Sequence, residues 1–128
     1  MNTIMEALDI KQEELTPDRV VFSMPVTGKT KQPMGYLHGG ASVVLAETAA
    51  SVGTILNIDQ TKQSAFGIEI NANHIKSKRD GIVKAIATPF HKGKRTMIWD
   101  IKIIDENEDL ICISRCTVGV VDRSQDRS

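Results

Sequence analysis

The sequence predicts an α+β domain in which an antiparallel sheet wraps around one long central helix. Three observations predict this fold class. Residues 41–56 are apolar around most of a helical circumference, residues 65–121 form four alternating segments typical of strands, and turn-forming residues separate those segments. A helix that is apolar on nearly every side must be covered on nearly every side, so the sheet is expected to curl about it.

The composition allows a single domain without covalent or metal cross-links. The chain has 128 residues, 41% of them hydrophobic, and no stretch rich in Pro, Gly or Ser divides it. We expect one domain over residues 1–121 and a polar tail over residues 122–128. Cys112 and Cys116 stand four apart in an expected strand, roughly 13 Å from each other at about 3.3 Å per residue, which predicts buried, reduced thiols and no disulfide.

The charge pattern argues against two classes of partner. Lys plus Arg and Asp plus Glu balance at 16 each, so no net field attracts nucleic acid or an anionic membrane. No apolar run approaches the roughly 18 residues of a membrane-spanning helix, and residues 1–10 lack the pattern of a secretory signal. The expectation is a cytoplasmic protein that binds neither nucleic acid nor membrane.

The first elements are two short strands within residues 8–26, on either side of the turn residues 16–18. Val20, Phe22 and Met24 alternate with other side chains there, as in a strand that is buried on one face. A loop over residues 29–36 follows. The buried helix begins after it, at two successive glycines.

Four longer strands are predicted after the helix, connected as a meander. They are residues 65–76, 81–92, 95–104 and 110–121. Asp80-Gly81 and residues 106–109 supply the turn chemistry expected of antiparallel connections.

Glu47 is the only formally charged residue between Lys31 and Asp59. An ionised carboxylate in apolar surroundings is destabilising by several kcal/mol unless it is paired or hydrogen-bonded. A capping role does not fit mid-helix, and a solvent-facing stripe would carry more than one charge. We therefore interpret Glu47 as a functional carboxylate; the alternative is a glutamate that simply faces water.

His38-Gly39-Gly40 stands where the helix is expected to begin. Two glycines let the backbone approach a ligand closely, and the free N–H groups of a helix start attract negative charge. Such a site could stabilise the charge on a carbonyl oxygen under attack. The alternative is a tight turn without chemistry.

The spacing of Gly39 and Glu47 has a structural consequence. They are about 12 Å apart along the helix at about 1.5 Å per residue, so one carbonyl carbon cannot touch both. If both act on the same bond, Glu47 must come from the antiparallel helix of a neighbouring subunit. This predicts at least a dimer with a two-fold interface.

The remaining candidates are weaker by pattern alone. Gln32 could orient a water or a carbonyl from its loop, while His74 and His91 are isolated histidines. Lys94 and Arg95 belong to a basic cluster that would suit a ligand with several phosphates, although such clusters are usually just solvated. No His or Cys spacing predicts a metal site, and no Ser or Cys nucleophile elbow is present.

Residues 37–47, Leu-His-Gly-Gly-Ala-Ser-Val-Val-Leu-Ala-Glu, closely resemble the hotdog-fold aryl-CoA thioesterases. Residues 69–74 and 89–95 resemble the same branch, which includes 1,4-dihydroxy-2-naphthoyl-CoA thioesterases of menaquinone synthesis and thioesterases that proofread the enterobactin carrier protein. The resemblance covers nearly the whole chain. It implies the hotdog fold, hydrolysis of an aryl- or acyl-CoA thioester to free acid and CoA, and a homotetramer built as a dimer of dimers. It implies no separate cofactor, because coenzyme A is part of the substrate.

The resemblance also implies roles for individual residues. Glu47 corresponds to the nucleophile or general base, and Gly39 to the backbone N–H that polarises the carbonyl. Gln32 and His38 correspond to residues that position the attacking water and assist thiol departure, and in this branch they come from the subunit opposite to Glu47. The remaining correspondences are Ser51, a helper at the acyl site; His74, on the acyl or pantetheine path; and His91, Lys94 and Arg95, which would grip the nucleotide end of CoA.

Among the substrates of this branch, the resemblance favours 1,4-dihydroxy-2-naphthoyl-CoA, in menaquinone biosynthesis, as the expected one. Phenylacetyl-CoA, benzoyl-CoA and a carrier-protein thioester are the alternatives within the same activity. Two other functions stay open: a hotdog dehydratase or hydratase, and a non-catalytic protein that binds acyl-CoA.

Overall fold

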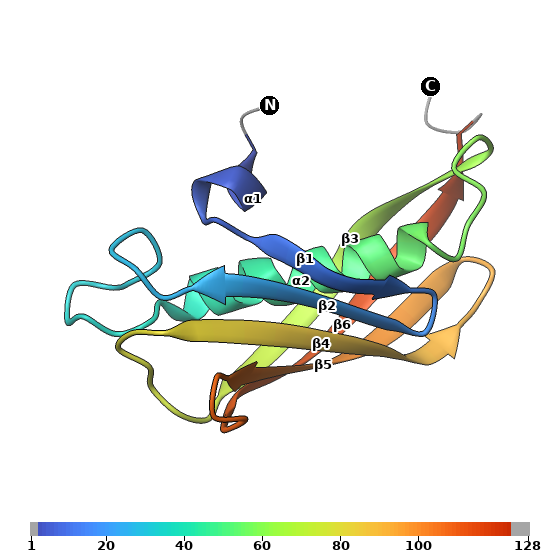
Figure 1. Ribbon diagram of the computed structural model, residues 1–128. Coiled ribbons are helices and arrows are strands. Elements are labelled where there is room, and N and C mark those ends of the chain that lie inside the picture. The colour runs from blue at the N-terminus through green and yellow to red at the C-terminus, as the bar shows by residue number, and fades with distance from the viewer. Residues whose placement is uncertain (1–2, 124–128) are drawn as a thin grey trace.

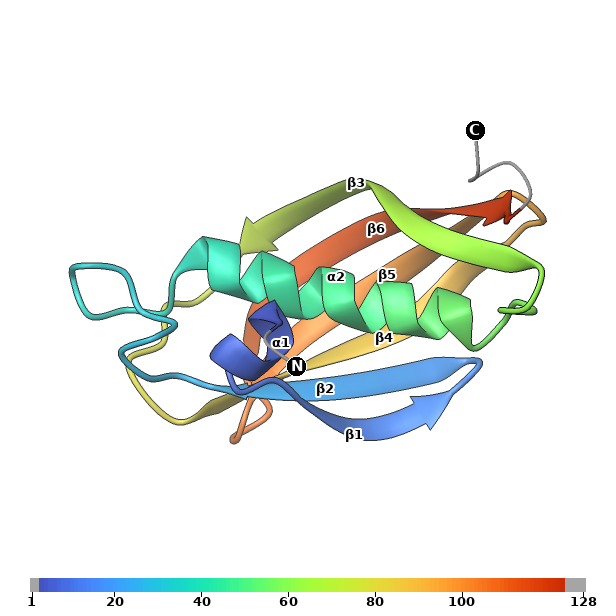
Figure 2. The ribbon, with the colours of Figure 1, turned by 90° about the horizontal axis from the view of Figure 1, so that it is seen from above.

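The structure, a computed structural model, describes residues 3–123. Its elements are α1 (Ile4–Ala7), β1 (Lys11–Thr16), β2 (Arg19–Pro25), α2 (Gly39–Ile55), β3 (Gln63–His74), β4 (Ile82–Lys92), β5 (Thr96–Asp105) and β6 (Leu110–Asp122). Six antiparallel strands form one sheet in the order β1-β2-β4-β5-β6-β3. The sheet curves around α2 (Figures 1 and 2), so the predicted α+β class is confirmed.

The predicted meander is wrong at the first strand after the helix. β3 does not pair with β4 but lies at the far edge of the sheet, where it pairs with β6 from Gln63 to His74. β4 pairs with β2 on one side and β5 on the other. Turn residues mark where the chain bends, but they do not determine which strand edges pair. Gly81, with φ 87°, lies in the connection from β3 to β4, which crosses over to the other side of the sheet and is not a hairpin.

Helix α2 packs closely on the sheet because most residues of its buried face are small. Its buried residues are Ala41, Ser42, Leu45, Ala46, Ala49, Ala50, Gly53 and Thr54. Trp99 of β5 lies against Gly53, where an added Cβ would stand 2.6 Å from the indole ring. The indole N–H of Trp99 donates to Thr54 Oγ1 at 2.9 Å, which satisfies the only polar atom of that buried ring.

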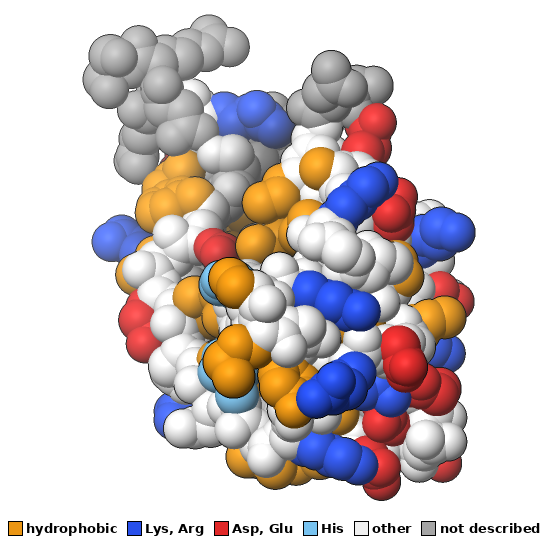
Figure 3. All heavy atoms as spheres, turned by 90° about the vertical axis from the view of Figure 1, so that its left-hand side faces the viewer, with side chains coloured by type: hydrophobic (Ala, Val, Ile, Leu, Met, Phe, Trp, Pro, Cys, Tyr) orange, Lys and Arg blue, Asp and Glu red, His pale blue; other side chains and the backbone are white. Residues whose placement is uncertain are grey.

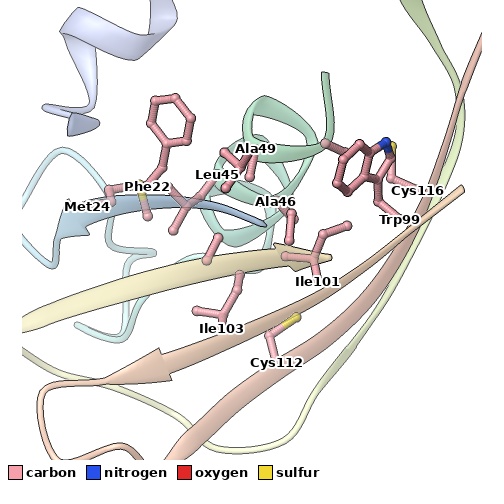
Figure 4. Close-up of a cluster of buried hydrophobic side chains, with 14 of the residues drawn as sticks. Phe22, Met24, Leu45, Ala46, Ala49, Trp99, Ile101, Ile103, Cys112 and Cys116 are labelled. Atoms are coloured by element: carbon pink, nitrogen blue, oxygen red, sulfur yellow. The ribbon is translucent and has the colours of Figure 1, made fainter. Parts of the chain in front are cut away.

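The core lies between α2 and the concave face of the sheet. Figure 4 shows Phe22 and Met24 of β2, Leu45 of α2 and Ile101 of β5 in this layer. Burial of each side chain of this size contributes about 1.5–3 kcal/mol. This apolar layer therefore holds α2 against the sheet.

The two cysteines are free and buried, as predicted. Burial, and to a smaller extent the carboxylates of Glu47 and Glu69, raise the pKa of the Cys116 thiol to about 12. Burial also raises the pKa of Cys112. Both groups are therefore thiols near neutral pH, the less reactive form.

The two ends of the described chain add detail to the predicted boundaries. Helix α1 was not predicted, and it packs beside α2 (Figure 2). Strand β6 ends at Asp122, the first residue of the predicted polar tail. Residues 124–128 of that tail lie outside the described residues, so the domain division remains a prediction. Within residues 3–123, neither helix is long and apolar enough to cross a membrane.

Candidate active site

The start of α2 presents a backbone N–H without an internal partner. His38 is the N-cap: its Nδ1 accepts the N–H of Gly40 at 2.8 Å, and its carbonyl accepts the N–H groups of Ala41 and Ser42. No acceptor within residues 3–123 binds the N–H of Gly39. That N–H stands at the positive end of the helix dipole and is available to an acceptor from outside the chain.

The same cap fixes which nitrogen of His38 carries the proton. Because Nδ1 accepts a hydrogen bond, the neutral ring carries its hydrogen on Nε2. The side chain is exposed, so this Nε2–H can reach a ligand as a donor. His38 is therefore arranged to donate a hydrogen bond to a ligand through Nε2.

The loop before the helix orients Gln32 in a comparable way. Its Oε1 accepts the backbone N–H groups of Met34 and Tyr36, which leaves the Nε2 donors as the free end of the amide. Tyr36 is held in turn by Arg79, whose Nη2 donates to the phenol oxygen at 2.8 Å and whose guanidinium lies 4.6 Å from the ring centroid. The loop before α2 thus offers the Gln32 amide N–H groups as hydrogen-bond donors.

Gln32 and Gly39 share a hollow of about 350 Å³, which we call the helix-start hollow. Its lining includes Gln32, Tyr36, Gly39, Ser42 and His74. His74, at the end of β3, packs directly on the glycine: a Cβ added at Gly39 would stand 2.7 Å from His74 Nε2. Figure 3 shows this end of the molecule, where histidine atoms lie among hydrophobic side chains and a row of Lys and Arg stands beside them.

Glu47 lies in a second hollow of about 420 Å³, which we call the Glu47 hollow. Thr3, Ile4 and Met5 of the α1 segment and Val44, Glu47, Thr48, Ser51 and Val52 of α2 line it. Glu47 is partly buried, and no residue in the described part of the chain pairs with its carboxylate or donates a hydrogen bond to it. An unpaired carboxylate beside an apolar wall is the kind of group that active sites use.

The structure therefore divides the predicted site in two. Gln32, Gly39 and His74 share the helix-start hollow, while Glu47 shares the other hollow with Ser51. His38 precedes Gly39 as the N-cap but is not among the residues that line the hollow. The Glu47 hollow contains none of the helix-start donors. This division agrees with the spacing argument, and the dimer that would unite the two halves stays a prediction.

The three residues predicted to grip the nucleotide lie elsewhere, at the β4–β5 turn. Lys94 and Arg95 line a hollow of about 670 Å³ together with Phe66 and Ile68 of β3. The ring of His91 packs on the turn, where a Cβ added at Gly93 would stand 2.7 Å from its Nε2. Among residues 3–123, Lys94 and Arg95 form no ion pair, so both charges are free to meet phosphates.

The described residues contain no group of three or more His, Cys, Asp or Glu side chains that could hold a metal ion. The available chemistry is that of donors at the start of α2, one carboxylate, and exposed cations. Such a set suits attack on a polarised carbonyl.

The comparisons with known proteins define the class. The sequence profile of the Thioesterase superfamily matches residues 34–112, and the chain belongs to this family of hydrolases. Its fold is the hotdog fold, as the resemblance implied, and the predicted thioesterase class is confirmed.

Particular relatives are close in sequence and in structure. ComA2 of Bacillus subtilis, a protein named as an esterase, is 58% identical over 120 residues, which are 94% of this chain and 95% of ComA2. The 1,4-dihydroxy-2-naphthoyl-CoA hydrolase of Listeria monocytogenes is 50% identical over 91% of this chain and 94% of its own. The crystal structure of a glutamate-to-alanine variant of SAV0944 from Staphylococcus aureus superposes with a TM-score of 0.92 at 48% identity, covering 94% of this chain and 99% of that one.

Two parts of the site were missed at the sequence level, although each has a signal. The α1 segment carries Thr3-Ile4-Met5-Glu6, a capping-box pattern, and Thr3 Oγ1 accepts the N–H of Glu6 at 3.3 Å. Gly67, which touches Glu47, is a glycine inside a strand pattern, and that is a known sign of a bulge.

Proposed function

We propose that this thioesterase hydrolyses aryl-CoA thioesters, with 1,4-dihydroxy-2-naphthoyl-CoA as its preferred substrate, at sites formed between two copies of the chain. One observation carries the proposal: the helix-start hollow offers hydrogen-bond donors, and the Glu47 hollow offers an unpaired carboxylate. Hydrolysis of a thioester needs both, because the carbonyl oxygen must be stabilised while its carbon is attacked.

The donors act on the carbonyl end of the substrate. The Gly39 N–H binds the thioester oxygen, and its place at the start of α2 favours the negative charge that builds up there. Gln32 Nε2 orients the attacking water. His38 Nε2–H donates a hydrogen bond to the sulfur as the carbon–sulfur bond breaks and so stabilises the departing thiolate. The proton that CoA finally carries comes from the attacking water.

Glu47 of the partner subunit supplies the attack. It either adds to the carbonyl carbon and forms a mixed anhydride that water then opens, or accepts a proton from the water that attacks directly. Its lack of an internal partner suits both roles, since a carboxylate held by Lys or Arg would be a poorer nucleophile and base. Ser51, one turn later on α2, faces the same hollow and helps to seat the acyl group.

Charged residues indicate where the rest of the substrate binds. Lys94 and Arg95 are unpaired cations for the phosphates of CoA, and His91 packs on the same turn. His74 lines the helix-start hollow, where the acyl or pantetheine part would lie. The naphthoyl group is the preferred acyl group because the Listeria monocytogenes relative, 50% identical, is named for that substrate. We further propose a cytoplasmic homotetramer, a dimer of dimers, in menaquinone biosynthesis.

The test compares Glu47→Gln with Glu14→Gln, which removes an exposed carboxylate of β1 that lies in neither hollow. The substrates are dihydroxynaphthoyl-, phenylacetyl-, benzoyl- and medium-chain acyl-CoA and an acyl carrier protein. Glu47→Gln is expected to lower kcat/KM for the preferred ester about 100- to 10,000-fold, and Glu14→Gln to leave it unchanged. Near-full turnover by Glu47→Gln would remove the proposal. Preference for phenylacetyl-CoA, benzoyl-CoA or the carrier protein would correct only the substrate.

Two further outcomes identify the other functions. Hydration of an enoyl-CoA by the native protein would indicate a hydratase. CoA esters that bind tightly and stay intact through long incubation would indicate a binding protein without catalysis.

A further inference from the structure

Strand β3 contains a bulge beside Glu47. Its pairing with β6 is regular except between Gly67, opposite Val118, and Glu69, opposite Thr117, so that Ile68 is an extra residue. In a regular strand, residues three apart point to opposite faces. Here Gly67 faces α2 and Ile70 also packs on the core, so the bulge allows both to face the helix.

Side chains on the outer face of the sheet hold this bulge in place. Val118 and Val120 of β6 belong to the core, so Gly119 between them faces outward. A Cβ added at Gly119 would stand 2.9 Å from both Phe66 Cζ and Ile68 Cδ1, which shows that these side chains lie over it. Phe66 and Ile68 thus lie on the outer face of the sheet, whereas Gly67 between them faces α2.

The carboxylate of Glu47 occupies the space that a side chain at position 67 would need. A Cβ added there would stand 2.2 Å from Glu47 Oε2 and 3.3 Å from its Cδ. Contacts of a Cβ below 3.0 Å are essentially unknown, so the carboxylate would have to move by roughly 1 Å. No described residue holds this carboxylate by a hydrogen bond, so the surface of Gly67 is what limits its position on the β3 side.

We propose that Gly67 is a positioning residue: the side-chain-free bulge of β3 seats the Glu47 carboxylate and sets the direction in which it meets the substrate. The proposal rests on the proposed function, because it acts only through Glu47. A displacement of about 1 Å in a reacting group can lower turnover by about 100-fold. The effect belongs to the chemical step, since Gly67 lines none of the three hollows.

The test is Gly67→Ala, with Gly28→Ala as the control because a Cβ at Gly28 meets nothing within 4 Å. We expect kcat to fall about 100-fold while KM changes by less than about threefold. The melting temperature should not fall, because Gly67 is exposed and alanine suits a strand at least as well as glycine. Native turnover by Gly67→Ala would overturn the proposal, and so would a loss of turnover that a fall in melting temperature explains.

A second experiment, in the Glu47→Asp variant, distinguishes a positioning role of Gly67 from a general loss of structure. In Glu47→Asp the carboxylate is one methylene shorter and leaves room for a methyl group at position 67. Gly67→Ala lowers kcat by one factor in the native protein and by another in Glu47→Asp. The second factor is expected to be at least ten times smaller than the first. Equal losses in the two backgrounds would overturn the positioning role.

The two proposals fail in different ways. If Glu47→Gln keeps full turnover, the proposed function is wrong and the role of Gly67 falls with it. If Glu47→Gln is inactive while Gly67→Ala turns over normally, only the positioning role is wrong.

Discussion

His38 can donate through Nε2 because its Nδ1 already accepts the N–H of Gly40, 2.8 Å away. Gln32 is oriented in the same manner, since backbone N–H groups occupy its Oε1. Glu47, by contrast, has no internal partner among the described residues. At the residue scale the chain therefore fixes its donors and leaves its carboxylate free, which is the arrangement that attack on a polarised carbonyl needs.

A second carboxylate, Asp105, is held tightly at the β5–β6 turn. Lys78 Nζ donates to its Oδ2 at 3.2 Å, and the N–H groups of Asn107 and Asp109 donate to its Oδ1 at 2.9 Å. Burial acts to raise the pKa of Asp105, but these hydrogen bonds and Lys78 outweigh it and lower that pKa. The pKa of Lys78 is raised, and its hydrogen bond to Glu106 is the largest cause.

The direction of these shifts predicts how stability depends on pH. A lowered carboxyl pKa stabilises the fold above the unfolded value of about 3.9, and this part is lost as the pH falls through the folded pKa. A raised lysine pKa stabilises the fold below the unfolded value of about 10.4, and that part is lost as the pH rises through the folded pKa. Between these limits both contributions are present in full.

Asp105→Asn should therefore lower the melting temperature near pH 7, and the difference from the native protein should shrink as the pH falls below about 4. Thermal unfolding followed from pH 3 to pH 8 measures this. The control is Asp109→Asn, which removes an exposed ion pair with Lys76 and should change the melting temperature little. A difference that stays constant across the whole pH range would contradict the assignment.

At the scale of elements, the four-residue helix α1 lies at the Glu47 hollow. It packs beside α2 (Figure 2), and Ile4 and Met5 form a wall of the Glu47 hollow. Val44 and Val52 of α2 face the same space. An aryl ring next to Glu47 would be bounded by these apolar side chains, so we expect α1 to set the size of acyl group that fits.

Enlarging the hollow from the α1 side should change selectivity. Met5→Ala is expected to raise the ratio of kcat/KM for a naphthoyl ester to that for a benzoyl ester by about tenfold, since a larger ring gains room that a smaller one leaves empty. The control is Ala7→Ser, in the same helix but outside the lining of the hollow. An unchanged ratio would show that α1 does not bound the acyl group.

At the scale of the whole molecule, the proposed site is completed between two copies of the chain. Gly39 and Glu47 lie on one rigid helix and open into different hollows. In a two-fold dimer each site would take Gly39 from one subunit and Glu47 from the other. Two subunits that are each inactive for different reasons can therefore restore one another.

We predict that Glu47→Gln and Gly39→Ala, each nearly inactive alone, regain activity when unfolded together and refolded as a mixture. Half of the dimers in an equal mixture are mixed, and each mixed dimer has one intact site of two, so about a quarter of native activity is expected. Refolding each variant alone is the control. Activity no higher than the average of the two variants would mean that both groups act within one chain.

The sequence by itself determined the element types and several chemical candidates. The apolar run with one charge predicted both helix α2 and the importance of Glu47, and the glycine pair predicted the start of that helix, because these properties depend on neighbours within a few residues. The resemblance of residues 37–47 supplied the family. The sequence did not determine that β3 would pair with β6, since turn residues do not record which strand edges meet.

Only the tertiary structure decided how the candidates are grouped. It brought His74 onto Gly39 and Gly67 onto Glu47, and it carried Ile4 and Met5 over α2. These contacts join residues distant in the chain, and they depend on strand pairing, on one bulge and on the curvature of the sheet. A sequence records such long-range geometry only indirectly, whereas it records helix formation and isolated charge directly.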